Sequence, residues 1–163
     1  MCGIAGIIHR NKSGDVGTEM TSMLRALKHR GPDSTGFALY GAPVEDEYVM
    51  RYIVAEQEEL SSGFHIHEEL KERKALVDAR LRGLGVEIFS EEAVTEYAYR
   101  CRIKFDGDMR KMADFIEDVE GVEILSIGEG LELVKDLGDA DVVSNQYSLD
   151  DFAGTHGLGH TRM

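Results

Sequence analysis

A cysteine occupies position 2 of this sequence, directly after Met1 and directly before Gly3. If an aminopeptidase removes Met1, Cys2 becomes the first residue and carries both a thiol and a free α-amine. The thiol can then attack a carbonyl carbon while the amine accepts its proton, directly or through a water molecule. In model peptides a free α-amine has a pKa of about 8 and a thiol one of about 8.5, so this kind of chemistry suits neutral pH. Position 2 alone does not separate such a nucleophile from an arbitrary small residue before a strand.

Secondary-structure elements that could position Cys2 follow directly from the sequence pattern. The apolar run over 4–8 predicts a strand that would anchor the cysteine. A second cluster, RGPDSTG at 30–36, follows a helix expected over roughly 17–29, and its Gly-Pro pair ends that helix. A strand is expected over 37–40, and a third cluster, GLGHTRM, occupies 157–163. Taken singly, each of these clusters is an ordinary glycine-bearing turn beside a strand.

Together, the three clusters resemble the class II glutamine amidotransferase domain, a branch of the N-terminal nucleophile hydrolases. Members of that family begin Met-Cys-Gly-Ile, as at 1–4, and carry an Arg-Gly-Pro-Asp-type turn after the first helix, as at 30–33. They also carry a Gly-His-Thr-Arg-type strand, as at 159–162. The order of the clusters matches, and the combination is specific where a lone Met-Cys-Gly is not.

The resemblance implies a fold class and a division into domains. The expected fold is α+β, a partial four-layer αββα sandwich of the N-terminal nucleophile hydrolase type, with a small α/β insertion. The amidotransferase core is expected over 1–56 and 139–163, apparently truncated at its C-terminal end. The inserted α/β lobe is expected over 57–138.

The resemblance also implies roles for individual residues. Cys2 would be the nucleophile that forms a γ-glutamyl thioester and releases ammonia. Arg162 would hold the α-carboxylate of glutamine, which suits a guanidinium because its fork binds a carboxylate bidentately. Thr161 is assigned to substrate binding beside it, although strand alternation turns its side chain away from the side used by His160 and Arg162. His160 is expected to pack or hydrogen-bond rather than carry protons. A supporting role in the loops near the N-terminus is expected for Arg30, Gly31, Asp33 and His160.

Two parts of the family's site have no match in this sequence. In the family, an Asn-Gly pair downstream of the Gly-His-Thr-Arg strand supplies the oxyanion hole, and a later acidic residue holds the substrate's α-amine. Asn145 lies before that strand and is not followed by glycine. We therefore expect a completing C-terminal segment, supplied by another chain or by a longer gene product. The strand over 159–162 is expected to lie at an open sheet edge on which that segment would pair.

The composition of the chain limits the kinds of partner that we expect it to bind. The chain of 163 residues has a formal net charge of −13, which argues against nucleic acid and against an anionic membrane surface as partners. With no apolar run long enough to span a bilayer and no signal peptide, a cytoplasmic location is expected. The two cysteines, Cys2 and Cys101, do not suggest a disulfide framework. The sequence suggests no metal site, and no cofactor is expected.

The middle of the chain predicts a compact α/β lobe. The cleanest alternation of apolar and polar residues covers 97–105 and places Cys101 on the apolar face, as a core residue. Leu81 and Leu84 are expected on the same apolar face of a long helix. The expected elements are a helix over 64–83, a strand over 86–89, a strand over 97–105, a helix over 108–119, a strand over 122–127 and a helix over 131–137.

Two functions from different classes follow. The first is a glutaminase domain or subunit that hydrolyses glutamine and passes ammonia to a partner synthase, as in the glutamate-synthase type or a stand-alone amidotransferase subunit. The asparagine-synthetase and amidophosphoribosyltransferase types are the alternative branches. The second is a non-catalytic module, an incomplete amidotransferase-like fold with a regulatory or assembly role.

Overall fold

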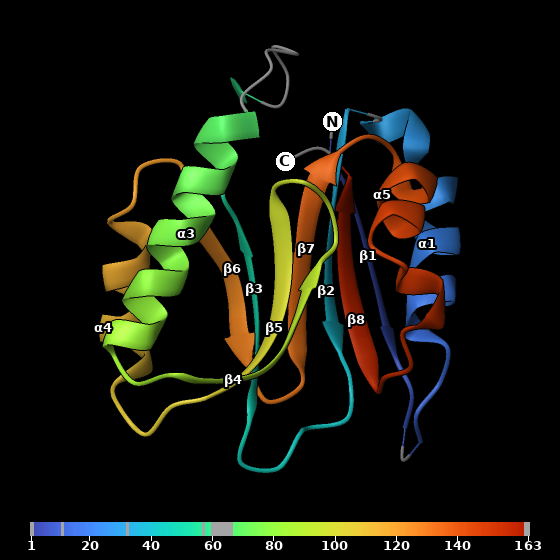
Figure 1. Ribbon diagram of the computed structural model, residues 1–163. Helices are drawn as coiled ribbons and strands as arrows, with labels where there is room; N and C mark the ends of the chain where they lie inside the picture. The colour runs from blue at the N-terminus through green and yellow to red at the C-terminus, as the bar shows by residue number, and fades with distance from the viewer. Residues whose placement is uncertain (1, 11, 32, 57, 60–66, 162–163) are drawn as a thin grey trace. The chain divides into compact units, whose positions relative to one another are not determined.

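The computed structural model describes residues 2–10, 12–31, 33–56, 58–59 and 67–161. The fold is α+β, with two four-stranded sheets whose strands pair in antiparallel fashion (Figure 1). The chain forms two compact units, one from Met1–Glu45 with Gly128–Met163 and the other from Asp46–Ile127. These limits differ from the predicted insertion at 57–138. The strand Tyr48–Ile53, which precedes the predicted insertion, belongs to the second unit, and the strand Leu131–Leu137, which was predicted inside it, belongs to the first.

The sheet of the first unit has the order β1-β8-β2-β7. These strands are β1 (Gly3–Ile8), β8 (His156–Thr161), β2 (Ser34–Tyr40) and β7 (Leu131–Leu137). Strand β8, the last in the chain, is therefore interior and pairs with β1 on one side and with β2 on the other. The prediction of an open edge at this strand was wrong, since the edges of this sheet are β1 and β7.

Helices α1 (Val16–Ala26) and α5 (Ala140–Gln146) belong to the first unit, together with two short 3-10 turns at Lys28–Arg30 and Leu149–Asp151. Helix α1 packs closely on β8 because that strand presents glycine to it. A Cβ atom at Gly159 would lie only 2.5 Å from Leu24 Cδ1. The hydroxyl of Thr21 on α1 donates to Ser144 Oγ on α5 at 2.9 Å, which ties the two helices together.

The opposite face of strands β1 and β8 carries exposed apolar side chains. Residues that pair directly across antiparallel strands share a face, and Ile4 and Ile8 alternate with Gly3 and Ala5 along β1. Ile4 is 72% exposed, Ile8 77% and Leu158 54%. This face of the sheet is therefore apolar and accessible next to Cys2.

The second unit has a sheet of order β4-β5-β3-β6, and its described residues include the helices α3 and α4. Its elements are β3 (Tyr48–Ile53), α3 (His67–Gly83), β4 (Glu87–Ala93), β5 (Ala98–Lys104), α4 (Met109–Glu117) and β6 (Glu123–Gly128). Strand β5 alternates as predicted, and Cys101 is confirmed as a fully buried core residue. Side chains from both helices and from the sheet form one core, which includes Met50, Tyr52, Val77, Leu81, Cys101, Ile103, Met112 and Ile116.

The helix predicted over 131–137 was wrong, because this segment forms strand β7. Its side chains alternate between buried and half-buried positions, and the buried ones are Glu132, Val134 and Asp136. Two of these three are acids, so hydrophobicity does not alternate along the segment and the strand period is hidden. Asp136 is satisfied in the interior, since its carboxylate accepts from the Leu137 amide at 2.7 Å and from the Tyr147 hydroxyl at 2.9 Å.

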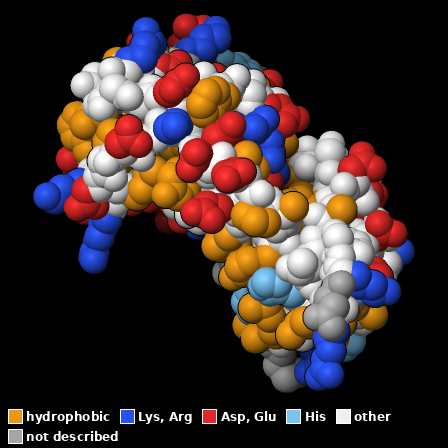
Figure 2. All heavy atoms as spheres, turned by 90° about the horizontal axis from the view of Figure 1, so that it is seen from below, with side chains coloured by type: hydrophobic (Ala, Val, Ile, Leu, Met, Phe, Trp, Pro, Cys, Tyr) orange, Lys and Arg blue, Asp and Glu red, His pale blue; other side chains and the backbone are white. Residues whose placement is uncertain are grey.

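Other elements agree more closely with the sequence pattern. Helix α3 is confirmed over 67–83, and the predicted start at 64 lies outside the described residues. Strand β4 extends beyond the predicted 86–89 and contains an irregularity between Ile88 and Ser90. In the face that Figure 2 shows, acidic and basic side chains are interspersed over the surface. Among the residues described, no helix combines the length and apolarity needed to cross a membrane.

Two leucines near the end of α3 test the packing of the second unit. Leu81 is fully buried, whereas Leu84 follows the last helical residue and is 37% exposed. We expect Leu81→Ala to lower the free energy of unfolding by about 2–5 kcal/mol, because it leaves a cavity. Leu84→Ala, the matched control, should cost less than about 1 kcal/mol. Urea unfolding followed by circular dichroism measures both, and equal losses would contradict the packing described.

Candidate active site

The first and third sequence clusters meet through the pairing of β1 with β8. Gly3 lies opposite Thr161 in the register, and the Gly3 amide donates a hydrogen bond to the Thr161 hydroxyl oxygen at 3.1 Å. Thr161 also lies opposite Thr35 on β2, at the end of the second cluster. Strand β8 is distant in the sequence from both β1 and β2, yet it lies between them, and the ends of these strands meet next to Cys2.

Residues at and just before the start of the second cluster also lie close to Gly3. A Cβ atom at Gly3 would lie 2.9 Å from Thr161 Oγ1, 3.0 Å from Leu27 Cβ and 3.3 Å from Arg30 Cβ. These distances are shorter than ordinary van der Waals contact, so glycine is the residue that this position accommodates without a shift of its neighbours. The 3-10 turn Lys28–Arg30, which follows α1, thus forms one wall around the residue next to Cys2.

The loop between the 3-10 turn and β2 is held by Gly138. The Gly138 amide donates to the carbonyl oxygen of Asp33 at 2.9 Å, and the Thr35 hydroxyl donates to the carbonyl oxygen of Gly138 at 2.9 Å. Gly31 is buried in this loop, whereas the Asp33 side chain is exposed. Sequence reasoning missed Leu27 and Gly138 in this arrangement. The signal for Gly138 was its place between a strand and Asp139, whose carboxylate caps the next helix.

The predicted site residues differ in how far their side chains are exposed to solvent. Cys2 is exposed at the start of β1. Thr161 is only 2% exposed and faces the same side of the sheet as Gly3. His160, the preceding residue, is half-buried and lies on the opposite face, where it pairs with Ile4. Arg162 lies outside the described residues, one position beyond the end of β8.

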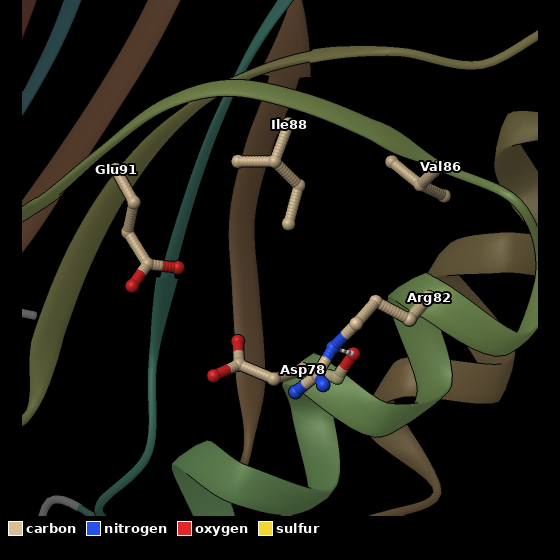
Figure 3. Close-up of a pocket in the computed structure, with 5 residues that line it drawn as sticks. All are labelled: Asp78, Arg82, Val86, Ile88 and Glu91. Carbon is tan, nitrogen blue, oxygen red and sulfur yellow. Dashed lines mark hydrogen bonds between the residues drawn. The ribbon is translucent and has the colours of Figure 1, made fainter.

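A separate hollow lies within the second unit, between α3 and the edge strand β4 (Figure 3). It has a volume of about 380 Å³ and is lined by Asp78, Arg82, Val86, Ile88 and Glu91. Its carboxylates are already paired, since the ammonium of Lys74 lies 2.6 Å from Asp78 and 2.9 Å from Glu91. We therefore assign these charges to the packing of α3 against β4.

The two cysteines lie in contrasting environments. Burial in the core of the second unit, beside the Glu91 carboxylate, raises the pKa of the Cys101 thiol to about 12. Thiolate is the reactive form of cysteine, so Cys101 is both inaccessible and protonated near neutral pH. Across the described ranges, His, Cys, Asp and Glu side chains form no group of three or more that could hold a metal ion.

This contrast predicts selective alkylation. At pH 8 a thiol with a pKa of about 12 is ionised in roughly one molecule in 10⁴. We expect iodoacetamide to modify Cys2 at least ~100-fold faster than Cys101, because Cys2 is exposed. Peptide mapping by mass spectrometry measures the two rates, and the same reaction in urea should label both residues. Predominant labelling of Cys101 in the folded protein would contradict the structure.

Comparison with known proteins found relatives that are similar to the whole of this chain. No family model matches the sequence. A protein of Methanothermobacter thermautotrophicus named "Putative glutamine amidotransferase" is 33% identical over 168 residues, covering 100% of this chain and 52% of its own length. The "Glutamine amidotransferase-like protein GlxB" of Rhizobium meliloti is 30% identical over 165 residues, covering 100% of this chain and 50% of its own length. The chain thus spans about half the length of these curated relatives, whose names refer to glutamine amidotransferases.

Proposed function

We propose that this chain supplies the glutaminase half-reaction of a class II glutamine amidotransferase, with Cys2 as its N-terminal nucleophile. The observation that carries the proposal is the meeting of the three clusters around Gly3, the residue next to Cys2. The names of the relatives supply the substrate, glutamine. The proposed fold is the αββα sandwich of N-terminal nucleophile hydrolases, and the α+β architecture with two sheets is compatible with it.

The proposed reaction has two steps. After removal of Met1, the α-amine of Cys2 takes the thiol proton, and the sulfur attacks the side-chain amide carbon of glutamine. A carbon–sulfur bond forms, the carbon–nitrogen bond breaks, and the nitrogen leaves as ammonia with the proton returned from the amine. Water then cleaves the γ-glutamyl thioester, which yields glutamate and restores the thiol. The sum is glutamine and water converted into glutamate and ammonia.

Exposure of Cys2 suits this role, because an attacking thiol must reach a substrate from solution. We assign the substrate's α-carboxylate to Arg162, whose guanidinium can bind it through two hydrogen bonds. Arg30, Gly31, Asp33 and His160 keep supporting roles. Of these, the Arg30 Cβ lies within 3.3 Å of the position that a Cβ at Gly3 would occupy, and the Asp33 carbonyl bonds the Gly138 amide.

The proposal needs groups that this sequence does not match. An oxyanion donor contributes roughly 10²–10³ in rate. Asn145, the asparagine before the Gly-His-Thr-Arg strand, lies in α5 rather than in a loop after β8. We therefore place the oxyanion donors and the ligand of the substrate's ammonium in a completing segment or partner subunit. The ammonia acceptor is proposed to be a synthase domain or subunit of the glutamate-synthase type, with the asparagine-synthetase and amidophosphoribosyltransferase types as alternative branches.

Substitution of the nucleophile tests the proposed activity. In the natural full-length protein with its partner, Cys2→Ser should lower kcat for release of glutamate from glutamine by more than ~10³-fold, because the nucleophile is lost. Cys101→Ala, the matched control, should leave kcat within about threefold, because Cys101 lies in the core of the other unit. Coupled assays of glutamate and ammonia measure both. Glutamine turnover that survives Cys2→Ser would overturn the assignment, and no turnover by the wild type would favour a non-catalytic module.

Removal of Met1 is a separate requirement. An α-nitrogen held in a peptide bond is an amide and cannot accept the thiol proton, so an uncleavable N-terminal tag should abolish glutaminase activity. A C-terminal tag is the matched control and should preserve it. Intact-mass spectrometry establishes whether Met1 is absent from the active form. Equal glutamine hydrolysis by the two tagged forms would rule out the amine of Cys2 as the base.

A further inference from the structure

We propose that Thr161 is a positioning residue for Cys2, acting through the Gly3 amide rather than by contact with the substrate. This inference rests on the proposed function, in which Cys2 is the nucleophile. The Thr161 hydroxyl oxygen accepts a hydrogen bond from the Gly3 N–H at 3.1 Å. The nitrogen of that amide is bonded directly to the carbonyl carbon of Cys2, so the hydrogen bond fixes the peptide plane between the nucleophile and β1.

The location of Thr161 favours a structural contact over a contact with glutamine. Thr161 is only 2% exposed, so its side chain presents almost no surface to a ligand. It shares a face of the sheet with Gly3, the face on which α1 packs against Gly159. His160, on the opposite face, is the neighbour that a ligand could approach. The sequence had assigned Thr161 to substrate binding, and the geometry points to a different role in the same site.

The Thr161 hydroxyl is one of the groups that hold the start of β1. Among the strands that the structure describes, β1 is an edge strand of its sheet and pairs with β8 alone. Gly3 is its first residue, where strands usually fray because fewer ladder hydrogen bonds hold them. The Thr161 hydroxyl adds a bond at this end, and Gly3 is approached by Arg30 of the 3-10 turn and by Leu27, which precedes that turn. Gly3 is thereby enclosed by groups from two sequence clusters.

Loss of the acceptor should therefore misplace the thiol more than it destabilises the fold. A misplacement of about 1 Å at a reacting group can cost roughly 100-fold in rate. The change should appear in kcat, because binding of glutamine does not use the Thr161 hydroxyl. A residue that contacts the substrate would instead change KM.

Paired substitutions separate the hydroxyl from the methyl group of Thr161. Thr161→Val keeps the shape and removes the acceptor, and Thr161→Ser keeps the acceptor and removes the methyl. We expect Thr161→Val to lower kcat for glutamine hydrolysis roughly 10- to 100-fold with KM within about threefold, and Thr161→Ser to restore kcat to within about threefold of wild type. A raised KM with unchanged kcat would assign Thr161 to substrate binding and overturn the proposal. Equal kcat losses in both variants would show that packing, not the hydrogen bond, is responsible.

A second measurement decides the question without glutaminase activity. In ¹⁵N-labelled protein, exchange of the Gly3 amide proton should be at least ~10-fold faster in Thr161→Val than in wild type, and near the wild-type rate in Thr161→Ser. Unchanged exchange in Thr161→Val would overturn the proposed positioning even if Cys2 proved to be the nucleophile. If the wild type does not hydrolyse glutamine, the exchange rates still test the contact while the proposed function fails separately. Should Thr161→Val not fold, Thr161→Ala removes the same acceptor without adding bulk and replaces it in both measurements.

Discussion

The interior position of β8 is the constraint on which the first unit depends. A strand with two neighbours brings its residues into register with both, so β8 aligns β1 and the end of the second cluster on β2 at once. Helix α1 packs on the glycines of the same strand, which allows it to approach the sheet closely. Sheet and helix layers are thus both organised by a segment of six residues near the end of the chain.

This arrangement makes the region around Cys2 a product of long-range contacts. The Gly3 amide and the Thr161 hydroxyl are separated by 158 positions in the sequence. Contacts of such separation form only after the entropy of closing a long loop has been overcome. In the sequence, the second unit is inserted between β2 and β7, so the region around Cys2 forms only when segments from both sides of this insertion pair in one sheet. Because the hydrogen bond between Gly3 and Thr161 joins such distant segments, it can influence the position of Cys2, the proposed nucleophile.

Prediction from the sequence succeeded where hydrophobic periodicity and burial coincide. Strand β5 and helix α3 bury the apolar residues that their patterns indicate, including Cys101 and Leu81. It failed for β7, where the buried positions include the acids Glu132 and Asp136. Asp136 can be buried because its carboxylate accepts hydrogen bonds from the Tyr147 hydroxyl and from the Leu137 amide, and the sequence pattern does not indicate these partners. It also failed for the place of β8 in the sheet, since strand order is set by contacts between distant segments. The resemblance proposed the residues of the candidate site, which stay a prediction, whereas the partner of the Thr161 hydroxyl is visible only in the structure.

The alternation of side chains along β8 explains the residue types of the third cluster. Successive side chains of a strand face opposite sides, so Gly159 and Thr161 face α1 while His160 faces away from it. The glycine admits the helix, and the threonine holds the start of β1 through its hydroxyl. The face of β8 that carries Gly159 and Thr161 thus packs on α1 and holds the start of β1. The opposite face, which carries His160, is accessible beside the exposed side chain of Ile4. A short strand with this alternation can therefore support the proposed nucleophile on one face and form part of its surroundings on the other. This explains why the three clusters are informative together, although each alone indicates only a turn.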